Sequence, residues 1–563
     1  MDAFHVFSEL PHVFAPLPKA SIMSQWDLAA QKLGLPGTVL MENAARSAFQ
    51  ALLAMFQDLK GLEVGLLIGS GNNGGDAAAI GRYLHEAGFA VTAYLVKDFP
   101  AYQGECAHQL QILQRLGLPL ENRTQLLSGP RPCDLLLDGL LGTGFQGPLR
   151  QDLCELIRSI NALKIPHVVA VDIPSGLSAD TGLPEPEALV ASHTICMSAC
   201  KKGLILPCAR PFTGQITTVP IGLPASVRLE LPADSYLVDE KLGLLSPEPP
   251  ANSYKNCFGH VAIVGGGDPA HTGAAHLAAR AALRAGAGLV TAIAKAGQAE
   301  TIRLNLAEIM LCPLEENRHG WPERLPRALE SLLPKLSALV IGPGFGLGPD
   351  AHHFLACLLT LPTRPPMVID ADALTLLAKH DELLDLVRSD DILTPHPGEA
   401  AALLGMTSRD LQRDRYQALA GLTARTRAIV VLKGAGTLVG QYQQPVLVSP
   451  WDLPALAIGG AGDVLAGLLG SMLAQRDALQ AMLNAKLCFA HKGDFVCRLY
   501  GLSKSSKMSC PSQAPLPNSA FGLILAAYAV SRHALAARRL LADYPQRGFL
   551  AHELADSLGR LPC

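Results

Sequence analysis

Three short loops in the first 220 residues carry oxygen donors at the ends of apolar runs. The loop GSGNNGGD, residues 69–76, follows the run VGLLI and contains Asn73. Asp138 ends the run LLLD, and Ser175 follows HVVAVDIP. Oxygen ligands suit a hard cation, and so few charges favour a weakly held cation over a zinc-like site. The pattern therefore predicts a cation site formed by Asn73, Asp138 and Ser175.

The run GTGFQGP, residues 142–148, adds backbone N–H groups that could face a phosphate at the start of a helix. Each loop also has a structural interpretation when it is taken alone. Asp138 or Asp172 could simply cap the helix that follows its strand, and the glycines of residues 69–76 do not match the dinucleotide fingerprint GxGxxG. Only the three loops together favour a ligand site.

A different chemistry is indicated by the loop GGAGD, residues 459–463, which opens the apolar helix VLAGLLGSMLA. Backbone N–H groups at that helix start would form an anion hole beside the carboxylate of Asp463. Phosphoryl transfer requires both a cradle for the developing charge and a base that accepts the proton of the acceptor hydroxyl. The alternative is that Asp463 only stabilises the first helical turn, and spacing alone does not separate the two.

Two further polar motifs follow strand-like runs in the same half. His396 lies in TPHPGE, where it is either a turn residue or a site residue. Its neighbour Glu399 offers a carboxylate for Mg²⁺ or for positioning a water molecule. Asp370 and Asp372 in VIDADAL end another run and could face the same cleft. We expect one of these two aspartates to be structural.

Strand-like apolar runs alternate with helical patterns in both halves of the chain. In the first half the runs are VGLLIG, VTAYLV, DLLLDG and HVVAVD, and a helical pattern over Leu28–Phe56 breaks at residues 34–37. In the second half the runs are HVAIVGGGD, GLVTAIA, ALVIGPGFG, PMVIDAD, DILTPHPGE and AIVVLKGAGT. This βαβ rhythm predicts an α/β fold with parallel sheets covered on both faces. The motifs of the two halves differ, so the chain is not an internal duplication.

A change of composition divides the chain. Residues 224–253 lose the βαβ rhythm and gain prolines. We therefore expect one domain over residues 1–225, a linker over 226–250 and a second domain over 251–563. The Ser/Pro/Lys-rich residues 499–519 predict a flexible insertion. The run FGLILAAYAV that follows is too short to cross a membrane, which predicts a packed helix.

The overall composition is that of a large globular protein. Hydrophobic residues make up 49% of the 563 positions and charged residues 17%, so a core can form and wholesale disorder is excluded. The formal charge of −3 gives no reason to expect nucleic acid or an anionic membrane as the main partner. The 13 cysteines are scattered, without zinc-ligand spacing, and the first residues are acidic where a signal peptide is basic. We expect a soluble cytoplasmic protein.

The first half resembles the NAD(P)HX epimerase domain of bacterial nicotinamide-nucleotide repair proteins, a Rossmann-like parallel-sheet sandwich. The resemblance rests on MENAA, GSGNNGGD, LLLDGLLGTGFQGP and VDIPSGL. It implies that K⁺ binds to Asn73, Asp138 and Ser175. It implies Asp172 as the candidate acid and base, with Lys201 in support. The hydrated dinucleotide would contact Asn72, Asn73, Gly74, Gly75, Asp76, Gly142, Thr143, Gly144, Phe145, Gln146, Gly147, Pro148 and Asp172.

The second half resembles the ribokinase-like ADP-dependent NAD(P)HX dehydratase. The resemblance rests on seven motifs in order, among them IGPGFG, VIDADAL, LTPHPGEAA, VVLKGAGTL and GGAGDVLAG. It implies Asp463 as the catalytic base. The adenine nucleotide, ADP or AMP, would contact Lys433, Gly434, Ala435, Gly436, Thr437 and Gly462. The hydrated nicotinamide would contact Ala274, Gly344, Gly346, His396 and Asp463.

The sequence departs from the family pattern at Ala77, Cys196-Met197, Ala461 and Lys492, and residues 499–540 resemble an insertion ahead of the family's closing helix. Together the two resemblances imply a bifunctional enzyme. It would interconvert the R and S epimers of NADHX and NADPHX and dehydrate the S epimer, consuming ADP to AMP and phosphate. Mg²⁺ and K⁺ would be its cations, and we expect a homo-oligomer. The alternatives are an ATP-dependent small-molecule kinase and a nucleotide-binding sensor without activity.

Overall fold

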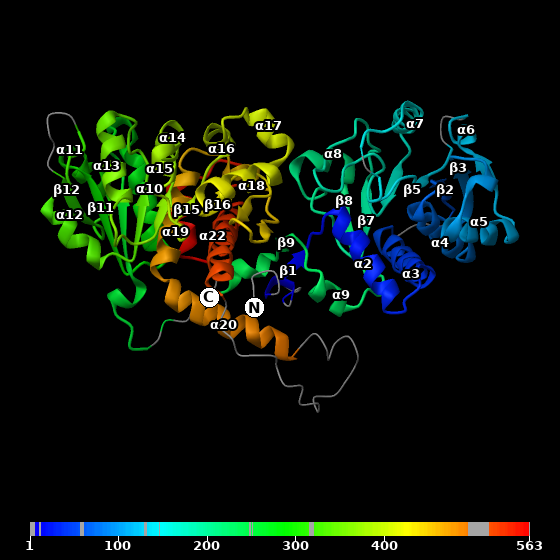
Figure 1. Cartoon of the computed structure of the whole chain (residues 1–563), viewed down its shortest axis with the longest axis horizontal. Helices are drawn as coiled ribbons and strands as arrows, with labels where there is room; N and C mark the ends of the chain where they lie inside the picture. The colour runs from blue at the N-terminus through cyan, green and yellow to red at the C-terminus, as the bar shows by residue number, and fades with distance from the viewer. Residues whose placement is uncertain are drawn as a thin grey trace. The chain divides into compact units, whose positions relative to one another are not determined.

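The computed structural model describes residues 6–8, 10, 13–56, 61–128, 132–145, 147–246, 249, 251–314, 320–493 and 517–561, with the backbone alone at 485–493 and 518–519. Gln146 and residues 499–516 of the predicted insertion lie outside this set. The chain forms two compact units (Figure 1). The first comprises Pro16–Tyr236, and the second comprises Leu237–Cys563 together with Met1–Ala15.

The unit Pro16–Tyr236 is built on a seven-stranded sheet whose neighbouring strands are all parallel, in the order β4-β3-β2-β5-β6-β7-β8. The strands are β2 (Glu63–Ile68), β3 (Ala90–Leu95), β4 (Leu120–Asn122), β5 (Leu135–Gly139), β6 (His167–Val171), β7 (His193–Met197) and β8 (Gln215–Val219). The four runs identified in the sequence are β2, β3, β5 and β6. The prediction of a parallel α/β sheet is confirmed for this half.

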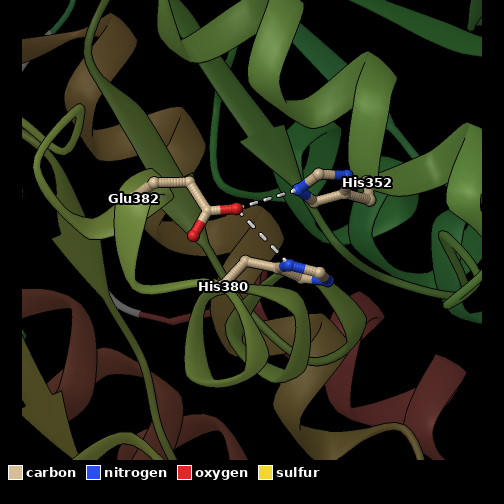
Figure 2. A group of neighbouring side chains, drawn as sticks. All are labelled: His352, His380 and Glu382. Carbon is tan, nitrogen blue, oxygen red and sulfur yellow. Dashed lines mark ion pairs between the residues drawn. The ribbon is translucent and has the colours of Figure 1, made fainter.

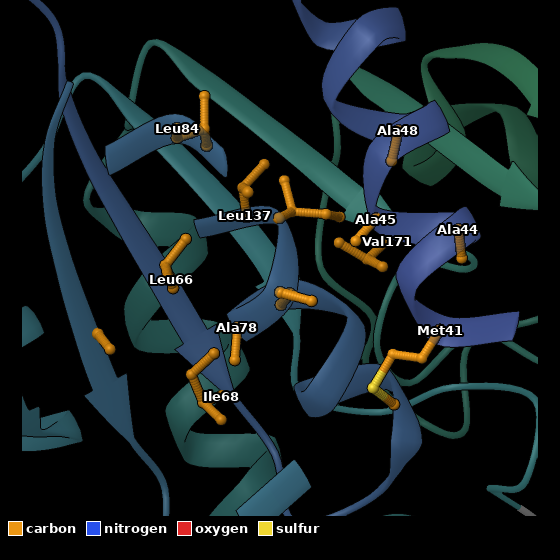
Figure 3. Packing of buried hydrophobic residues seen from close by; sticks show 14 of the residues in the cluster. Met41, Ala44, Ala45, Ala48, Leu66, Ile68, Ala78, Leu84, Leu137 and Val171 are labelled. Carbon is orange, nitrogen blue, oxygen red and sulfur yellow. The ribbon is translucent and has the colours of Figure 1, made fainter. Parts of the chain in front are cut away.

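Helices cover both faces of this sheet, because successive strand residues point to opposite sides. They are α2 (Ala20–Lys32), α3 (Gly37–Met55), α4 (Asn72–Glu86), α5 (Gly104–Arg115), α6 (Arg123–Leu126), α7 (Gln151–Ala162), α8 (Arg210–Thr213) and α9 (Ala225–Glu230). Leu66 and Ile68 of β2 pack with α3, α4 and α5, whereas Leu67 belongs to the cluster with α7. The alanines of α3 let this helix lie close to the sheet, and Met41 fills the end of the contact (Figure 3).

The second unit is built on an eleven-stranded sheet in the order β1-β9-β18-β17-β16-β15-β14-β13-β10-β11-β12. Strands β10 to β16 pair in parallel, and β16, β17 and β18 pair antiparallel. The strands are β1 (Phe14–Pro16), β9 (Ser235–Val238), β10 (His260–Val264), β11 (Leu289–Lys295), β12 (Met310–Leu314), β13 (Ala338–Ile341), β14 (Met367–Ile369), β15 (Ile392–Leu393), β16 (Ile429–Leu432), β17 (Leu438–Gly440) and β18 (Val446–Val448). All six runs predicted in this half are strands.

The helices of the second unit pack closely on this sheet, α10 against β10 and β11 and α19 against β10, β13 and β14. They are α10 (Thr272–Arg284), α11 (Ala296–Arg303), α12 (Arg327–Leu332), α13 (Pro349–Leu359), α14 (Asp372–Lys379), α15 (Asp381–Leu384), α16 (Pro397–Leu404), α17 (Ser408–Arg413), α18 (Arg415–Thr426), α19 (Ala461–Ala474), α20 (Arg476–Gly493), α22 (Asn518–Leu540) and α23 (Ala551–Leu558).

Helix α22 changes the interpretation of the predicted insertion. It contacts α19, α23 and strands β16 to β18, so the second half of residues 499–540 belongs to the core. By length and composition Ala520–Leu540 could cross a membrane, but 89% of its most apolar part is buried inside the structure. The expectation of a packed helix after the Ser/Pro/Lys-rich segment is met.

The predicted linker is also structured. Within residues 226–250, β9 joins the large sheet between β1 and β18. Backbone bonds run from Leu17 N to Ser235 O (2.8 Å) and from Asp239 N to Val13 O (2.8 Å). The N-terminal residues therefore belong to the second unit, not to a domain spanning 1–225, because they complete the open edge of its sheet.

Two candidate active sites

A cavity of about 510 Å³ opens at the carboxyl ends of the strands in the first unit. The predicted substrate residues that line it are Asn72, Asn73, Asp76, Gly142, Thr143, Gly144, Phe145 and Asp172. Gly74 and Gly75 are buried in the first turn of α4, while Gly147 and Pro148 are exposed beside the loop. The register of β2 with β5 brings Ile68 opposite Gly139, so the loops after both strands start at the same edge.

The backbone segments at this edge of the sheet approach one another so closely that two positions have no room for a side chain. An ideal Cβ on Gly69 would lie 1.8 Å from Leu140 O, and one on Gly74 would lie 1.9 Å from Gly69 O. Glycine is therefore required at both positions, because any side chain would collide with a backbone carbonyl. The glycines of the loop let the β2–α4 turn and the β5 loop touch.

Asn73, Asp138 and Ser175 come together beneath the cavity, around the backbone of Leu141. Ser175 Oγ donates to Asp138 Oδ1 (2.6 Å), and Ser175 N donates to Asp138 Oδ2 (2.8 Å). Leu141 N donates to Ser175 Oγ (2.8 Å), and Asn73 Nδ2 donates to Leu141 O (2.8 Å). Three separate loops are thereby held in one hydrogen-bonded group.

One acceptor of this group is left over. Asn73 Oδ1 is buried and has no hydrogen-bond partner among the residues that the structure describes. Burial raises the pKa of Asp138 to about 6, and its bonds from Ser175 and Leu140 oppose the shift. A buried, unsatisfied amide oxygen beside a fully buried carboxylate is a set of donors that suits a weakly hydrated monovalent cation. The residues present therefore fit K⁺.

Asp172 and Lys201 form a buried ion pair at the wall of the cavity. Lys201 Nζ and Met197 N both donate to Asp172 Oδ1, the latter at 2.8 Å. Asp172 Oδ2 accepts no hydrogen bond from the described residues. Burial alone would lower the pKa of Lys201, but the charge of Asp172 raises it above its ordinary value. Asp172 adopts a left-handed backbone with φ 69°, which turns the residue at the strand end.

Three further carboxylic acids share the cavity with Asp172. Burial, followed by the charges of Asp172, Asp27 and Glu105, raises the pKa of Asp76 well above its usual range. Burial and Asp172 raise the pKa of Asp27 to about 6. Asp76 was predicted as a contact residue, but Asp27 on α2 and Glu105 on α5 were not. Both lie on amphipathic helices without a turn motif, so the sequence carried no signal for them.

In the second unit, loops from five neighbouring parallel strands meet at one sheet edge. The register pairs Val264 with Ile341, Ile341 with Ile369 and Ile369 with Leu393. The motifs GGGD, GPGFG, DAD, TPHPGE and KGAGT all begin immediately after these strands and β16. Because carboxyl ends of parallel strands share an edge, motifs about 170 residues apart in the sequence converge.

Asp463 lies in the first turn of α19, behind Gly460 with φ 90°. Burial and then the charge of Asp370 raise the pKa of Asp463 to about 7, although Lys433 lowers it. Lys433 Nζ donates to Asp370 Oδ1 (2.7 Å) and lies 4.0 Å from Glu399 Oε2. Of the two strand-end aspartates, Asp370 thus pairs with the lysine of the nucleotide motif.

Lys433 is nearly enclosed by these acids. Burial alone would lower the pKa of Lys433, yet Asp370 and Glu399 raise it. A Cβ built on Gly462 would lie 3.5 Å from Lys433 Nζ, so the amine sits against the glycine turn that opens α19. A fixed cation next to the N-terminal amides of a helix is an arrangement that stabilises phosphoryl oxygens.

His396 is the N-cap of α16. Its Nδ1 accepts from Gly398 N (2.9 Å) and Glu399 N (3.2 Å), and Glu399 Oε2 accepts from His396 N (2.8 Å). Burial and Lys433 lower the pKa of His396. The ring is therefore neutral, with Nδ1 as acceptor, and its Nε2 lies 3.5 Å from Glu399 Oε1. The turn interpretation and the site interpretation of His396 are compatible.

Glu399 and Asp372 lie near the charged group of Lys433, Asp370 and Asp463. Burial raises the pKa of Glu399 to about 7, against the effect of Lys433. Asp372 Oδ2 accepts from Gly346 N (2.8 Å), which ties α14 to the GPGFG loop. A Cβ on Gly344 would lie 2.2 Å from His271 O, so that loop also touches the start of α10, where Ala274 lies. The predicted substrate residues of this half are thus held around one group of charges.

The glycine loop Lys433–Thr437 is held by a residue that the sequence did not indicate. Arg415 at the start of α18 donates from Nη1 to Ala435 O (2.5 Å) and from Nη2 to Leu432 O (3.2 Å). Thr437 Oγ1 donates to Gly434 O (2.8 Å), which closes the loop. Lys433 N donates to Pro395 O (2.9 Å) and Gly436 N to Trp451 O (3.2 Å), so the loop backbone is preorganised.

His533 of α22 was also missed. It is fully buried, and burial lowers its pKa to about 4. The ring is neutral, so Nε2 carries the proton that it donates to Ala461 O (3.0 Å). Ala461 is the departure from the family's GGAGD pattern, and His533 bonds its carbonyl directly. The one signal was that His533 follows the apolar run FGLILAAYAV on the same helix.

Comparison with known proteins places both halves. The family model described as YjeF-related protein N-terminus matches residues 37–203, and the model described as NAD(P)H-hydrate dehydratase matches residues 261–510. A solved structure of ADP/ATP-dependent NAD(P)H-hydrate dehydratase from Bacillus subtilis, co-crystallised with ATP/Mg²⁺, is 24% identical with a TM-score of 0.42. The match covers 57% of the present chain and 96% of the Bacillus subtilis chain.

Full-length relatives match across both units. The Bifunctional NAD(P)H-hydrate repair enzyme Nnr of Coxiella burnetii is 34% identical over 464 residues, which cover 81% of this chain and 89% of the relative. The Escherichia coli protein of the same name is 34% identical over 449 residues, which cover 80% of this chain and 83% of the relative. The chain therefore belongs to the family of bifunctional NAD(P)H-hydrate repair enzymes.

Proposed function

We propose that this chain epimerises the hydrates of NADH and NADPH in its first unit and dehydrates the S epimer in its second, with ADP as the phosphoryl donor. The observation that carries the proposal is the group of Asp463, Lys433 and Asp370 beside the start of α19, in which Asp370 is buried and the other two are half-buried. The test is incubation of the purified chain with both epimers and ADP, followed by the recovery of the reduced-nicotinamide absorbance. Recovery with ATP but not ADP would favour the small-molecule kinase interpretation.

In the first unit, Asp172 is the acid and base. Epimerisation moves a hydroxyl from one face of the hydrated ring carbon to the other, so a proton must reach the departing oxygen and leave the incoming one. Asp172 lines the cavity, and Lys201 and Met197 N fix its Oδ1, so Oδ2 would be the atom that exchanges the proton. The glycine-rich loop and the start of α4 bind the dinucleotide phosphates.

In the second unit, Asp463 accepts the proton of the substrate hydroxyl as its oxygen attacks the β-phosphorus of ADP. The bond between that phosphorus and AMP breaks, which leaves AMP and a phosphorylated hydrate. Elimination then removes phosphate and one ring proton and restores NADH or NADPH. Lys433 and the amides of Gly462 and Asp463 stabilise the charge on the transferring group.

Each unit has residues that would bind a cation, K⁺ in the first unit and Mg²⁺ in the second. Asn73, Asp138 and Ser175 would hold K⁺, whose charge would balance the buried carboxylate and order the phosphate-binding loop. Glu399 and Asp372 would hold Mg²⁺ together with the nucleotide, and the ion would neutralise phosphate charge. Burial, and after it the charges of Asp370 and Asp372, raise the pKa values of Glu399 and Asp463, and a divalent cation would offset that excess of negative charge.

Replacement of Asp138 by Asn should abolish the response of epimerisation to K⁺ and slow it by about tenfold or more, since metal-site partners contribute roughly that much. The variant retains the size of the buried side chain and removes its charge. The measurement is the rate of epimer exchange with KCl replaced stepwise by choline chloride. Dehydration of pure S epimer should be unaffected, and an equal fall in both activities of a folded variant would contradict the two-site assignment.

The dehydration rate should fall as the pH drops below about 7. Asp463 must be ionised to accept a proton, and its raised pKa of about 7 means that it is largely protonated in mildly acidic solution. Measurement of kcat/KM for the S epimer across this range should show a loss approaching tenfold per pH unit. A rate that is flat down to about pH 5 would show that no group with a raised pKa acts as the base.

We also propose the cytoplasm as the location and a homo-oligomer as the assembly. The location is supported by the free thiols of the described cysteines, among them the buried Cys106 and Cys196. Light scattering coupled to gel filtration tests the assembly.

A further inference from the structure

A histidine pair and a glutamate meet on the surface of the second unit, outside the residues assigned above. His352 lies in the first turns of α13, His380 lies between α14 and α15, and Glu382 lies in α15 (Figure 2). His352 Nε2 is 3.7 Å from Glu382 Oε1, and His380 Nδ1 is 3.5 Å from the same oxygen. Three potential metal ligands from two parts of the chain thus face one point.

The two nitrogen–oxygen distances approach those of tetrahedral coordination. Zinc binds imidazole nitrogen at about 2.0–2.1 Å and carboxylate oxygen at about 2.0–2.2 Å. Two such ligands at a tetrahedral angle lie roughly 3.3–3.5 Å apart, from the same bond lengths. The two nitrogen–oxygen distances are close to that value, and all three ligand atoms lie within 4.8 Å of one another.

A second observation concerns the nitrogen of His352 that points at this site. The Nε2 atom is buried, and no hydrogen bond satisfies it within the described part of the chain. The imidazoles of His352 and His380 also stack, with ring centroids 3.9 Å apart and planes at 32°. Both rings direct a nitrogen at the same carboxylate oxygen, and a buried nitrogen without a hydrogen bond needs a partner.

We propose that His352, His380 and Glu382 form a Zn²⁺ site, with solvent in the fourth position. Two histidines, one carboxylate and an open position are a common zinc donor set. The site is distinct from the proposed dehydratase centre, because α14 separates His380 from Asp372 by about 12 Å of helix. Nothing in the proposal depends on the enzymatic activity.

The ion would connect two helices that each begin at a loop of the dehydratase centre. Helix α13 starts three residues after Gly346, and α14 starts at Asp372. A zinc bridge between α13 and the α14–α15 junction would hold both helix ends and thus stabilise these loops. We therefore expect zinc to raise the thermal stability of the unit.

The experiment is zinc titration of the full chain, without an affinity tag, in competition with a chromogenic chelator. The parent should bind one more Zn²⁺ per chain than the variant H352Q/H380Q/E382Q, and each single replacement should weaken this zinc by about tenfold or more. Co²⁺ in place of zinc should give the visible absorption of a tetrahedral site in the parent. Other zinc bound by thiols or by the dehydratase acids remains in the variants, so the difference reports this site alone.

His353→Gln is the matched control. His353 adjoins His352 on α13, but its Nε2 bonds Glu323 O at 2.8 Å, away from the site. H353Q should bind zinc as the parent does, and zinc should raise the Tm of the parent and H353Q but not of E382Q. Parental zinc stoichiometry and affinity in the triple variant would overturn the proposal, as would an equal loss in H353Q.

Discussion

Replacement of Asp463 by Asn should reduce ADP-dependent dehydration of the S epimer by about 10²–10⁴-fold, the usual contribution of a general base. Asparagine has nearly the same shape but cannot take the hydroxyl proton at neutral pH. Asp463 is half-buried, and after burial the charge of Asp370 contributes to its raised pKa. Loss of the charge should therefore leave the fold intact or slightly stabilised. Initial rates at saturating ADP, with thermal unfolding of the same samples, measure both effects.

The matched control for this variant is Asp477→Asn. Asp477 also lies in the first turn of a helix, α20, but its side chain is 97% exposed. If Asp463 were only a helix-stabilising acid, both replacements should change stability by no more than about 1 kcal/mol and leave the rate unchanged. Near-parental dehydration by D463N would return Asp463 to that structural role. Epimerisation should continue in both variants.

The convergence of the loops was predictable because it follows from topology. Parallel strands must deliver their following residues to one edge, so Asn73, Asp138 and Ser175 had to be neighbours once β2, β5 and β6 were recognised. The same argument brought Lys433 and Asp370 to one edge. Apolar runs that end in polar or glycine-rich turns mark such edges directly in the sequence.

Site residues that lie on helices could not be predicted from the strand order. Asp27, Glu105 and His533 reach their sites from the sides of helices, where a polar residue in a helical pattern usually faces solvent. Their burial depends on how helices pack, which is long-range information. Strands β1 and β9 were missed for a related reason, because strands of three or four residues that lie about 220 positions apart carry no periodic signal.

The second large effect is expected in the first unit, from Asp172→Asn. Asp172 occupies a left-handed backbone conformation with φ 69°. Asparagine tolerates this region better than alanine, so the turn should be preserved. Epimerisation should fall by about 10²–10⁴-fold as the acid and base is lost. Epimer exchange followed by chromatography measures this, while dehydration of pure S epimer in the same preparation should continue.

This variant alone could mislead, because it leaves Lys201 charged, fully buried and without its carboxylate. Removal of one partner of a buried ion pair destabilises by roughly 3–5 kcal/mol. The double variant Asp172→Asn/Lys201→Met removes the unpaired charge and keeps the length of the side chain. Restored thermal stability without restored epimerisation would separate catalysis from folding. Restored epimerisation in the double variant would mean that Asp172 serves only to neutralise Lys201, and that the acid and base is another carboxylate of the cavity.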